Sequence, residues 1–151
     1  MWSDAVLAYL HFISIFALVG FLVREWTLLA AGAEALEVEA LARADLGFGL
    51  TSVAVLLSGA ARAVFGLKGW SFYAHDPAFH LRIGLFVLVG LLSIGPTRAF
   101  LRWRRAARAD GAYRVPEGEW TRARRGVLVE LHLLALIPLA AVIMARGLGR
   151  G

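Results

Sequence analysis

The residues of this chain best suited to chemistry are histidines and charged side chains inside long apolar segments. His11 lies within the uncharged run Ala5–Val23. A neutral imidazole binds iron, and the core of a helix bundle can hold a planar cofactor, so His11 is a candidate axial ligand of haem. A lone histidine between helices can also act only as an interhelical hydrogen-bonding group. The sequence leaves both interpretations open.

Cations are expected near His11, where the propionates of a haem would need them. If the apolar segments form helices, Arg62, Lys68 and Arg82 lie at the same membrane level as His11. Guanidinium groups bind carboxylates through charge-assisted hydrogen bonds. We therefore predict a haem b site with His11 as the metal ligand and with Arg62 and Arg82 as contacts to propionates or to an anionic substrate.

Two further ionisable residues, Glu130 and His132, lie in the last apolar segment. Two positions on a helix correspond to a rotation of about 200°, so both cannot face one central pocket. One of them is expected between helices or at the contact of a homo-oligomer. A proton or ion path through both residues stays open, as does an ion pair of Glu130 with Arg98 or Arg125. Copper is disfavoured because membrane copper sites use Cys and Met, and the chain has no Cys and two Met.

Composition places the chain in a membrane. It has 151 residues, of which 60% are hydrophobic and 18% charged, and its mean hydropathy is +0.69. Soluble domains of this size have about half their residues apolar and about a quarter charged. The absence of cysteine excludes a disulfide scaffold and thiolate catalysis. The length suits one transmembrane domain over residues 1–151.

The elements that would position these residues are helices. The apolar segments predict an all-α, antiparallel four-helix membrane bundle, with helices at about 3–31, 40–66, 78–104 and 120–147. Strands are not expected, because the runs are continuous and do not alternate with period two. The first helix is expected to be retained rather than cleaved as a signal peptide, because no Lys or Arg precedes Arg24.

One face of the first helix is expected to point into the bundle. Three ionisable residues and one leucine follow a seven-residue spacing along this face, at Asp4, His11, Leu18 and Glu25. Small residues in the helices would let neighbouring backbones approach closely. The glycines expected to do so are Gly20, Gly47, Gly59, Gly84 and Gly90.

The distribution of cations predicts the orientation. Eleven of the sixteen Lys and Arg residues fall on one side of the four predicted helices, nine of them in Arg98–Arg125. The positive-inside rule then predicts a bacterial cytoplasmic (inner) membrane protein with both termini outside. We expect the basic loop to contact the lipid bilayer rather than nucleic acid, and acidic residues of Gly32–Asp45 to cover part of it. Trp103 and Trp120 are predicted to form an inner aromatic belt.

Several local motifs carry a resemblance to known families. They are Leu10-His11-Phe12-Ile13, Arg62–Gly69, Phe79–Leu85 and Gly90–Thr97. With these motifs the chain resembles, over nearly its whole length, a bacterial family of four-span membrane proteins, a domain of unknown function. In the first and third helices it is also similar to the superfamily of HemJ-type protoporphyrinogen oxidases and CopD-type copper-resistance membrane proteins.

The second resemblance implies roles for individual residues. His11 takes the position of the haem-ligating histidine of HemJ proteins, and Arg82 that of their functional lysine in the third helix. Arginine stays charged and cannot act as a base, so Arg82 implies contact with an anion. The further histidine of HemJ proteins in that helix is absent, because 93–96 reads Ser-Ile-Gly-Pro. The resemblance implies a haem-dependent membrane oxidoreductase; the alternative is a non-catalytic membrane scaffold or accessory subunit without a cofactor.

Overall fold

The apolar segments form long helices because they are continuous, rich in Leu and Ala, and interrupted by turn-forming residues only between segments. A computed structural model of the protein describes residues 2–66 and 69–146. Within these ranges every regular element is a helix. The helices are α1 (Trp2–Ala30), α2 (Val38–Phe65), α3 (Gly69–Ala74), α4 (Pro77–Ala109) and α5 (Glu117–Ala145).

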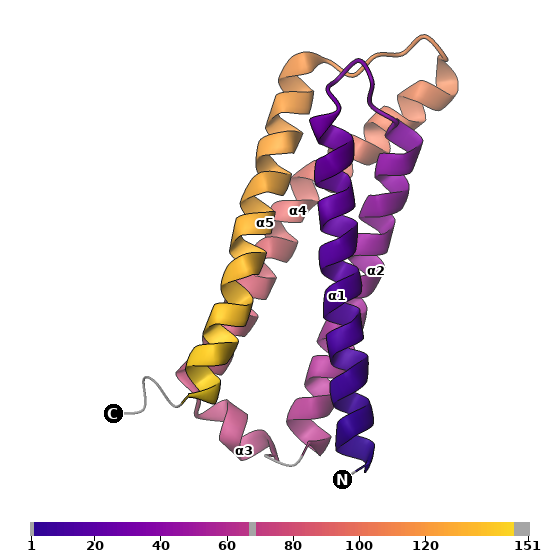
Figure 1. The fold of residues 1–151 in the computed structure, drawn as a ribbon. Helices are drawn as coiled ribbons and strands as arrows, with labels where there is room; N and C mark the ends of the chain where they lie inside the picture. The colour runs from indigo at the N-terminus through magenta and orange to yellow at the C-terminus, as the bar shows by residue number, and fades with distance from the viewer. Residues whose placement is uncertain (1, 67–68, 147–151) are drawn as a thin grey trace.

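The four long helices lie side by side along one axis and alternate in direction (Figure 1). The α1–α2 and α4–α5 loops meet at one end, which we call the arginine-rich end. The short helix α3 connects α2 to α4 at the opposite end, where α1 also begins; we call this the N-terminal end. The predicted all-α antiparallel four-helix bundle is thereby confirmed.

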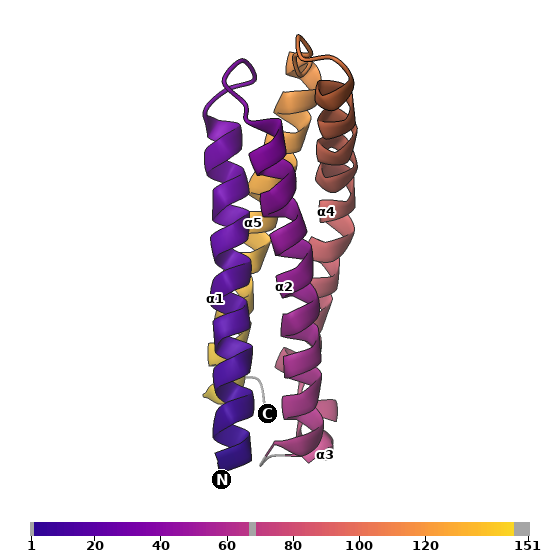
Figure 2. The ribbon, with the colours of Figure 1, turned by 90° about the vertical axis from the view of Figure 1, so that its right-hand side faces the viewer.

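The bundle consists of two helix pairs. Helix α1 packs mainly against α2, and α4 mainly against α5. Figure 1 shows that the two pairs lie close at the arginine-rich end and diverge toward the N-terminal end. Figure 2 shows α1 and α2 side by side. Leu29, Leu41, Phe100 and Trp103, which are completely buried, belong to the part near the arginine-rich end. The hydrophobic core therefore holds the pairs together mainly in that half.

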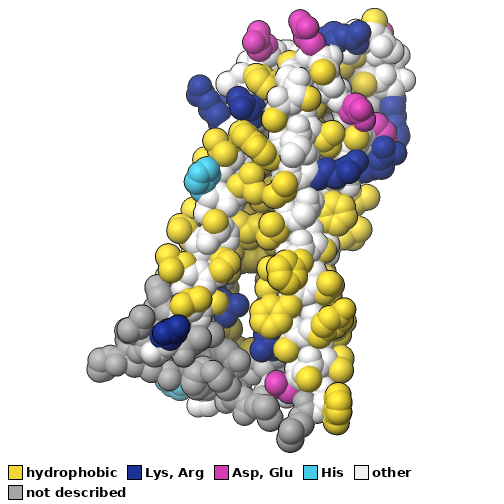
Figure 3. Space-filling model, in the orientation of Figure 1, with side chains coloured by type: hydrophobic (Ala, Val, Ile, Leu, Met, Phe, Trp, Pro, Cys, Tyr) yellow, Lys and Arg dark blue, Asp and Glu magenta, His cyan; other side chains and the backbone are white. Residues whose placement is uncertain are grey.

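The bundle surface is apolar enough for contact with lipid. Large hydrophobic side chains such as Phe16, Leu57 and Leu91 are more than half exposed, and Figure 3 shows hydrophobic atoms over much of the long faces. Three helical segments are long and apolar enough to cross a membrane, namely Trp2–Ala30, Val38–Phe65 and Phe79–Ala109. Helix α5 packs beside them, and residues 126–145 of its sequence contain one charged residue; that it is a fourth span stays a prediction.

Several helix ends differ from the predicted ones. Helix α4 continues to Ala109, five residues beyond the predicted end, because 105–109 consists only of Arg and Ala, which favour helix. Helix α5 begins at Glu117 instead of 120, with two acidic residues in its first turn, where they interact favourably with the helix dipole. Helix α3 was not predicted. The predicted end at residue 147 lies outside the described residues.

The inward face predicted for α1 is largely confirmed. His11, Leu18 and Glu25 are all buried in the bundle, whereas Asp4 is only half-buried. The prediction that Trp103 belongs to an inner aromatic belt at the membrane surface is wrong. Its indole is fully buried in the core because it packs on Phe100 and has a polar partner, described below, on α5.

The prediction that glycines let neighbouring helices approach closely is confirmed at Gly47 and Gly59. A Cβ atom at Gly47 would overlap the ring of Phe21, and one at Gly59 would lie 3.1 Å from Cε1 of His11. Both glycines therefore allow α1 to approach α2. The prediction is wrong for Gly20, Gly84 and Gly90, where a Cβ would meet no atom within 4 Å, because these positions point away from the neighbouring helices.

Candidate functional site

The imidazole of His11 is fixed between α1 and α2. The side chain is 7% exposed, and its Nδ1 atom lies 2.9 Å from Oγ of Ser58. The Ser58 hydroxyl donates its single proton to the carbonyl oxygen of Ala54, at 2.6 Å. It can therefore only accept from His11, so Nδ1 carries the imidazole proton. The ring also has a hydrogen bond with the backbone of Val55. With the proton on Nδ1, the Nε2 atom would keep its lone pair and could bind a metal.

Two arginines lie near this histidine. The charges of Arg62 and Arg82 both act on His11. Arg62 follows Ser58 by one helical turn and so lies on the same face of α2. Its guanidinium lies 5.6 Å from the ring centre of Phe12, and its Nε atom is buried without a hydrogen-bond partner among the described residues.

The surface is hollowed in the half of the bundle toward the N-terminal end. Figure 3 shows an opening between the two helix pairs in the half toward the N-terminal end, with Lys or Arg side chains inside it. The structure thus brings His11, Arg62 and Arg82 into one region where the helix pairs diverge. Lys68, predicted to join them, lies outside the described residues. Such a region can accept an anionic group that also has apolar surface.

The other histidines have local partners. The Nδ1 atoms of His75, His80 and His132 each lie 2.7–2.9 Å from a backbone carbonyl of the preceding helical turn. His132 is exposed on the outer face of α5, whereas Glu130 is 1% exposed in the interior. A path running through both residues is therefore not supported, because they face opposite sides of the helix.

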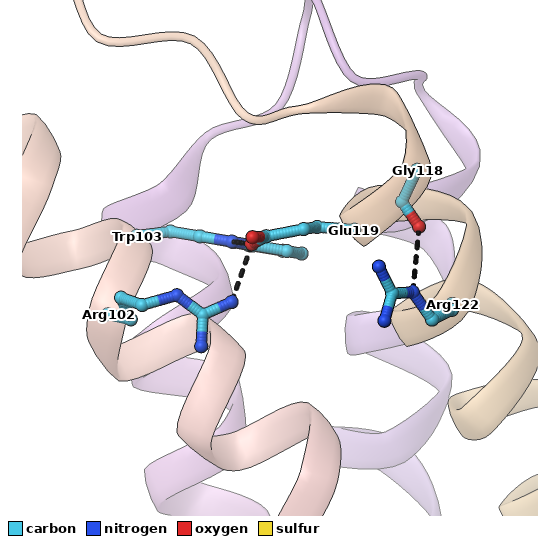
Figure 4. A network of polar contacts seen from close by, with 5 residues as sticks. All are labelled: Arg102, Trp103, Gly118, Glu119 and Arg122. Carbon is cyan, nitrogen blue, oxygen red and sulfur yellow. Dashed lines mark hydrogen bonds and ion pairs between the residues drawn. The ribbon is translucent and has the colours of Figure 1, made fainter.

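A polar network joins α4 and α5 at the arginine-rich end (Figure 4). One carboxylate oxygen of Glu119 accepts from Nε1 of Trp103 at 2.7 Å and from Arg102 at 2.5 Å. These hydrogen bonds, the one from Trp103 first, lower the pKa of the Glu119 carboxyl. Beside them, Nε of Arg122 donates to the carbonyl oxygen of Gly118 at 3.3 Å. The network is structural, since it gives the buried indole its partner.

The acidic residues of 32–45 divide between two roles. Glu39 pairs with Arg108 at 2.8 Å and with Arg104 at 3.9 Å, so one acid covers part of the basic segment as expected. Asp45 instead points into the bundle, where Oγ1 of Thr97 donates to its Oδ1 at 2.6 Å. The sequence did not predict this contact. The available signal was the position of Asp45, directly before the uncharged run 46–61.

The described side chains form no group of three or more His, Asp or Glu residues placed to hold a metal ion. A haem iron held by one histidine needs no such group, because the porphyrin supplies the other four nitrogen ligands. A single histidine such as His11 would therefore be enough to hold a haem.

Comparison with known proteins gives one family. The family described as predicted membrane protein (DUF2214) matches residues 3–149. No curated protein and no solved structure matches the chain. The similarity to HemJ-type and CopD-type proteins therefore stays a prediction from the motifs.

Proposed function

The chain belongs to the DUF2214 family of predicted membrane proteins, and we propose that it binds haem b between its two helix pairs, with Nε2 of His11 as the axial ligand. The hydrogen bond from Nδ1 of His11 to Ser58 carries this proposal. Metal-binding histidines typically donate their other ring N–H to a fixed acceptor, which sets the tautomer and the ring orientation. His11 has this arrangement and is buried as well.

The two arginines act as electrostatic contacts to the haem propionates. Among the described residues, the buried Nε atom of Arg62 has no hydrogen-bond partner, and a buried donor of a charged group is strongly stabilised by an anion. Arg82 adds a second positive charge near His11. Both side chains stay protonated, so they hold and orient an anion and do not abstract protons. Bound haem would supply one-electron chemistry.

The positive-inside rule supports an orientation in a bacterial inner membrane with the arginine-rich end in the cytoplasm. The His11 site then lies in the outer half of the membrane. In this orientation an electron partner or substrate reaches the site from the outer side or from the lipid, because the packed core closes the bundle toward the arginine-rich end.

A second candidate, a cofactor-free membrane scaffold, is supported by the same contact. The His11–Ser58 hydrogen bond and the close approach at Gly59 already join α1 to α2. Interhelical hydrogen bonds of this kind contribute about 1 kcal/mol or less. In this alternative His11 stabilises the helix pair, and the arginines face water or lipid headgroups.

The reduced-minus-oxidised absorption spectrum distinguishes the two. The full-length protein is expressed with a haem precursor, purified in detergent and compared with His11→Ala. The matched control is His132→Ala, which removes an exposed imidazole from α5. We expect Soret and α bands in the wild type and the control and their loss in His11→Ala. A flat wild-type spectrum rejects haem binding and leaves the scaffold.

A further inference from the structure

Three acidic side chains from three different helices are buried in the bundle and interact electrostatically. Glu25 of α1, Asp45 of α2 and Glu130 of α5 are 1%, 7% and 1% exposed. The charge of Glu25 interacts with both other carboxyls, and that of Glu130 with Asp45. No part of the proposed haem site uses these residues.

The cluster contains unpartnered oxygen atoms. Thr97 of α4 donates to Oδ1 of Asp45, so all four long helices contribute to the cluster. Oε1 of Glu25 and Oε1 of Glu130 are buried and have no hydrogen-bond partner among the described residues. A buried oxygen of a carboxyl group without a donor is costly, so these two atoms indicate a ligand that the side chains alone do not provide.

Among the described side chains, no cation forms an ion pair with the three acids. In α5, the arginine nearest in sequence to Glu130 that is not exposed is Arg124. Its guanidinium lies over the rings of Trp26 and Trp120, at 4.9 and 5.5 Å from the ring centres. Arg98 of α4 and Arg125 of α5 are exposed, as are Arg24 of α1 and Arg43 of α2. Within the described ranges, neither an arginine nor a histidine forms a salt bridge with any of the three acids.

We propose that Glu25, Asp45 and Glu130 form a proton-binding site in the bundle interior. Three ionised carboxylates in an apolar interior repel one another and lose their hydration, and neutralisation by a cation removes both costs. A metal ion would need several oxygens converging on one point, and the described acids show no such arrangement. A proton needs only one oxygen atom, so it is the cation that suits this geometry.

The site links the two helix pairs. Glu25 and Asp45 belong to the α1–α2 pair, while Glu130 and Thr97 belong to the α4–α5 pair. A proton bound here removes repulsion across the boundary between the pairs, and its release restores that repulsion. The cluster is separate from His11, so it can hold a proton whether or not a haem is bound there.

Infrared spectroscopy of the full-length protein in a detergent without carbonyl groups tests the site. The carboxylic-acid C=O stretching band, which only protonated carboxyls give, is recorded at neutral pH for the wild type and for Glu25→Gln, Asp45→Asn and Glu130→Gln. The control is Glu34→Gln, which removes an exposed acid from the α1–α2 loop. We expect a band in the wild type that is lost or reduced in at least one cluster variant and is unchanged in the control.

Two further arms make the result decisive. Circular dichroism of the helices identifies any variant that does not fold. If the variants fail to fold, the wild-type carboxylic-acid band and its shift in heavy water still report a protonated carboxyl. Absence of the band from the wild type overturns the proposal, as does its persistence in all three folded cluster variants. Replacing choline by Na⁺ at constant ionic strength should leave the band unchanged; its disappearance would show an alkali-cation site instead. The His11→Ala variant should keep the band, which separates this result from haem binding.

Discussion

The Nδ1 atom of His11 and the Oγ atom of Ser58 form a hydrogen bond of 2.9 Å across the α1–α2 contact. Ser58 can accept this bond because its own proton is directed at the carbonyl of Ala54. The pair fixes both the rotation of the imidazole and the atom that carries its proton. With the proton on Nδ1, Nε2 would keep its lone pair, and the function proposed for the chain depends on that atom.

The first prediction concerns Ser58→Ala. Loss of the acceptor removes the constraint on His11, and loss of such supporting partners typically weakens metal binding about 10–100-fold. We expect the dissociation constant for haem, measured by absorption titration in detergent, to rise by a factor in this range. Ser52→Ala is the matched control, since Ser52 bonds only to the carbonyl of Phe48 in its own helix. Equal affinities of the two variants would show that Ser58 does not orient the ligand.

The second prediction concerns Arg62→Gln. The substitution removes a positive charge near His11 but leaves the axial ligand in place, so the haem should bind more weakly without a change in the Soret position. We expect a rise in the dissociation constant of about tenfold or more, which corresponds to about 1.4 kcal/mol. Arg43→Gln removes an exposed arginine from the same helix and serves as the control. A shifted Soret band with unchanged affinity would contradict a role in propionate binding.

The third prediction tests the packing of α1 on α2. A methyl group at Gly47 would overlap the ring of Phe21, whereas one at Gly49 would meet nothing within 4 Å. Overpacking of this kind costs about 1–3 kcal/mol, while Gly→Ala at an open helical position gains up to about 1 kcal/mol. Thermal unfolding in detergent, followed by circular dichroism, should therefore show a lower Tm for Gly47→Ala and an equal or higher Tm for Gly49→Ala. A Gly47→Ala protein as stable as the wild type would mean that the ring can move aside.

The fourth prediction concerns acid. Hydrogen bonds from Trp103 and Arg102 lower the pKa of Glu119 in the folded protein relative to the unfolded chain, where it is roughly 4.3. The carboxylate therefore stabilises the fold above the unfolded pKa, and this contribution is lost as the pH falls through the lower folded pKa. The Tm of the wild type should exceed that of Glu119→Gln at neutral pH, and the difference should shrink at acid pH. The control Glu117→Gln changes an exposed acid in the same helical turn; if it lowered the Tm equally, the network around Trp103 would not be the cause.

The amino-acid pattern was enough to predict a membrane protein and its long helices. Continuous apolar runs fixed the number and approximate extent of the long helices, because a chain in lipid must satisfy its backbone hydrogen bonds within each segment. The seven-residue spacing also identified the inward face of α1, with His11 and Glu25 on it. The angular separation of Glu130 and His132 followed from helix geometry alone, and the structure places them on opposite faces.

The tertiary structure decided which side chains meet. Helix period does not specify how far one helix slides or turns against another, and here that register is set by contacts such as Gly47 with Phe21 and Gly59 with His11. These contacts place Ser58 beside His11, and packing between the two pairs places Thr97 beside Asp45. They also bury Trp103, because its indole finds Glu119 within the bundle. Packing between helices, and not the pattern along any one of them, assembled the buried acids and gave His11 its partner.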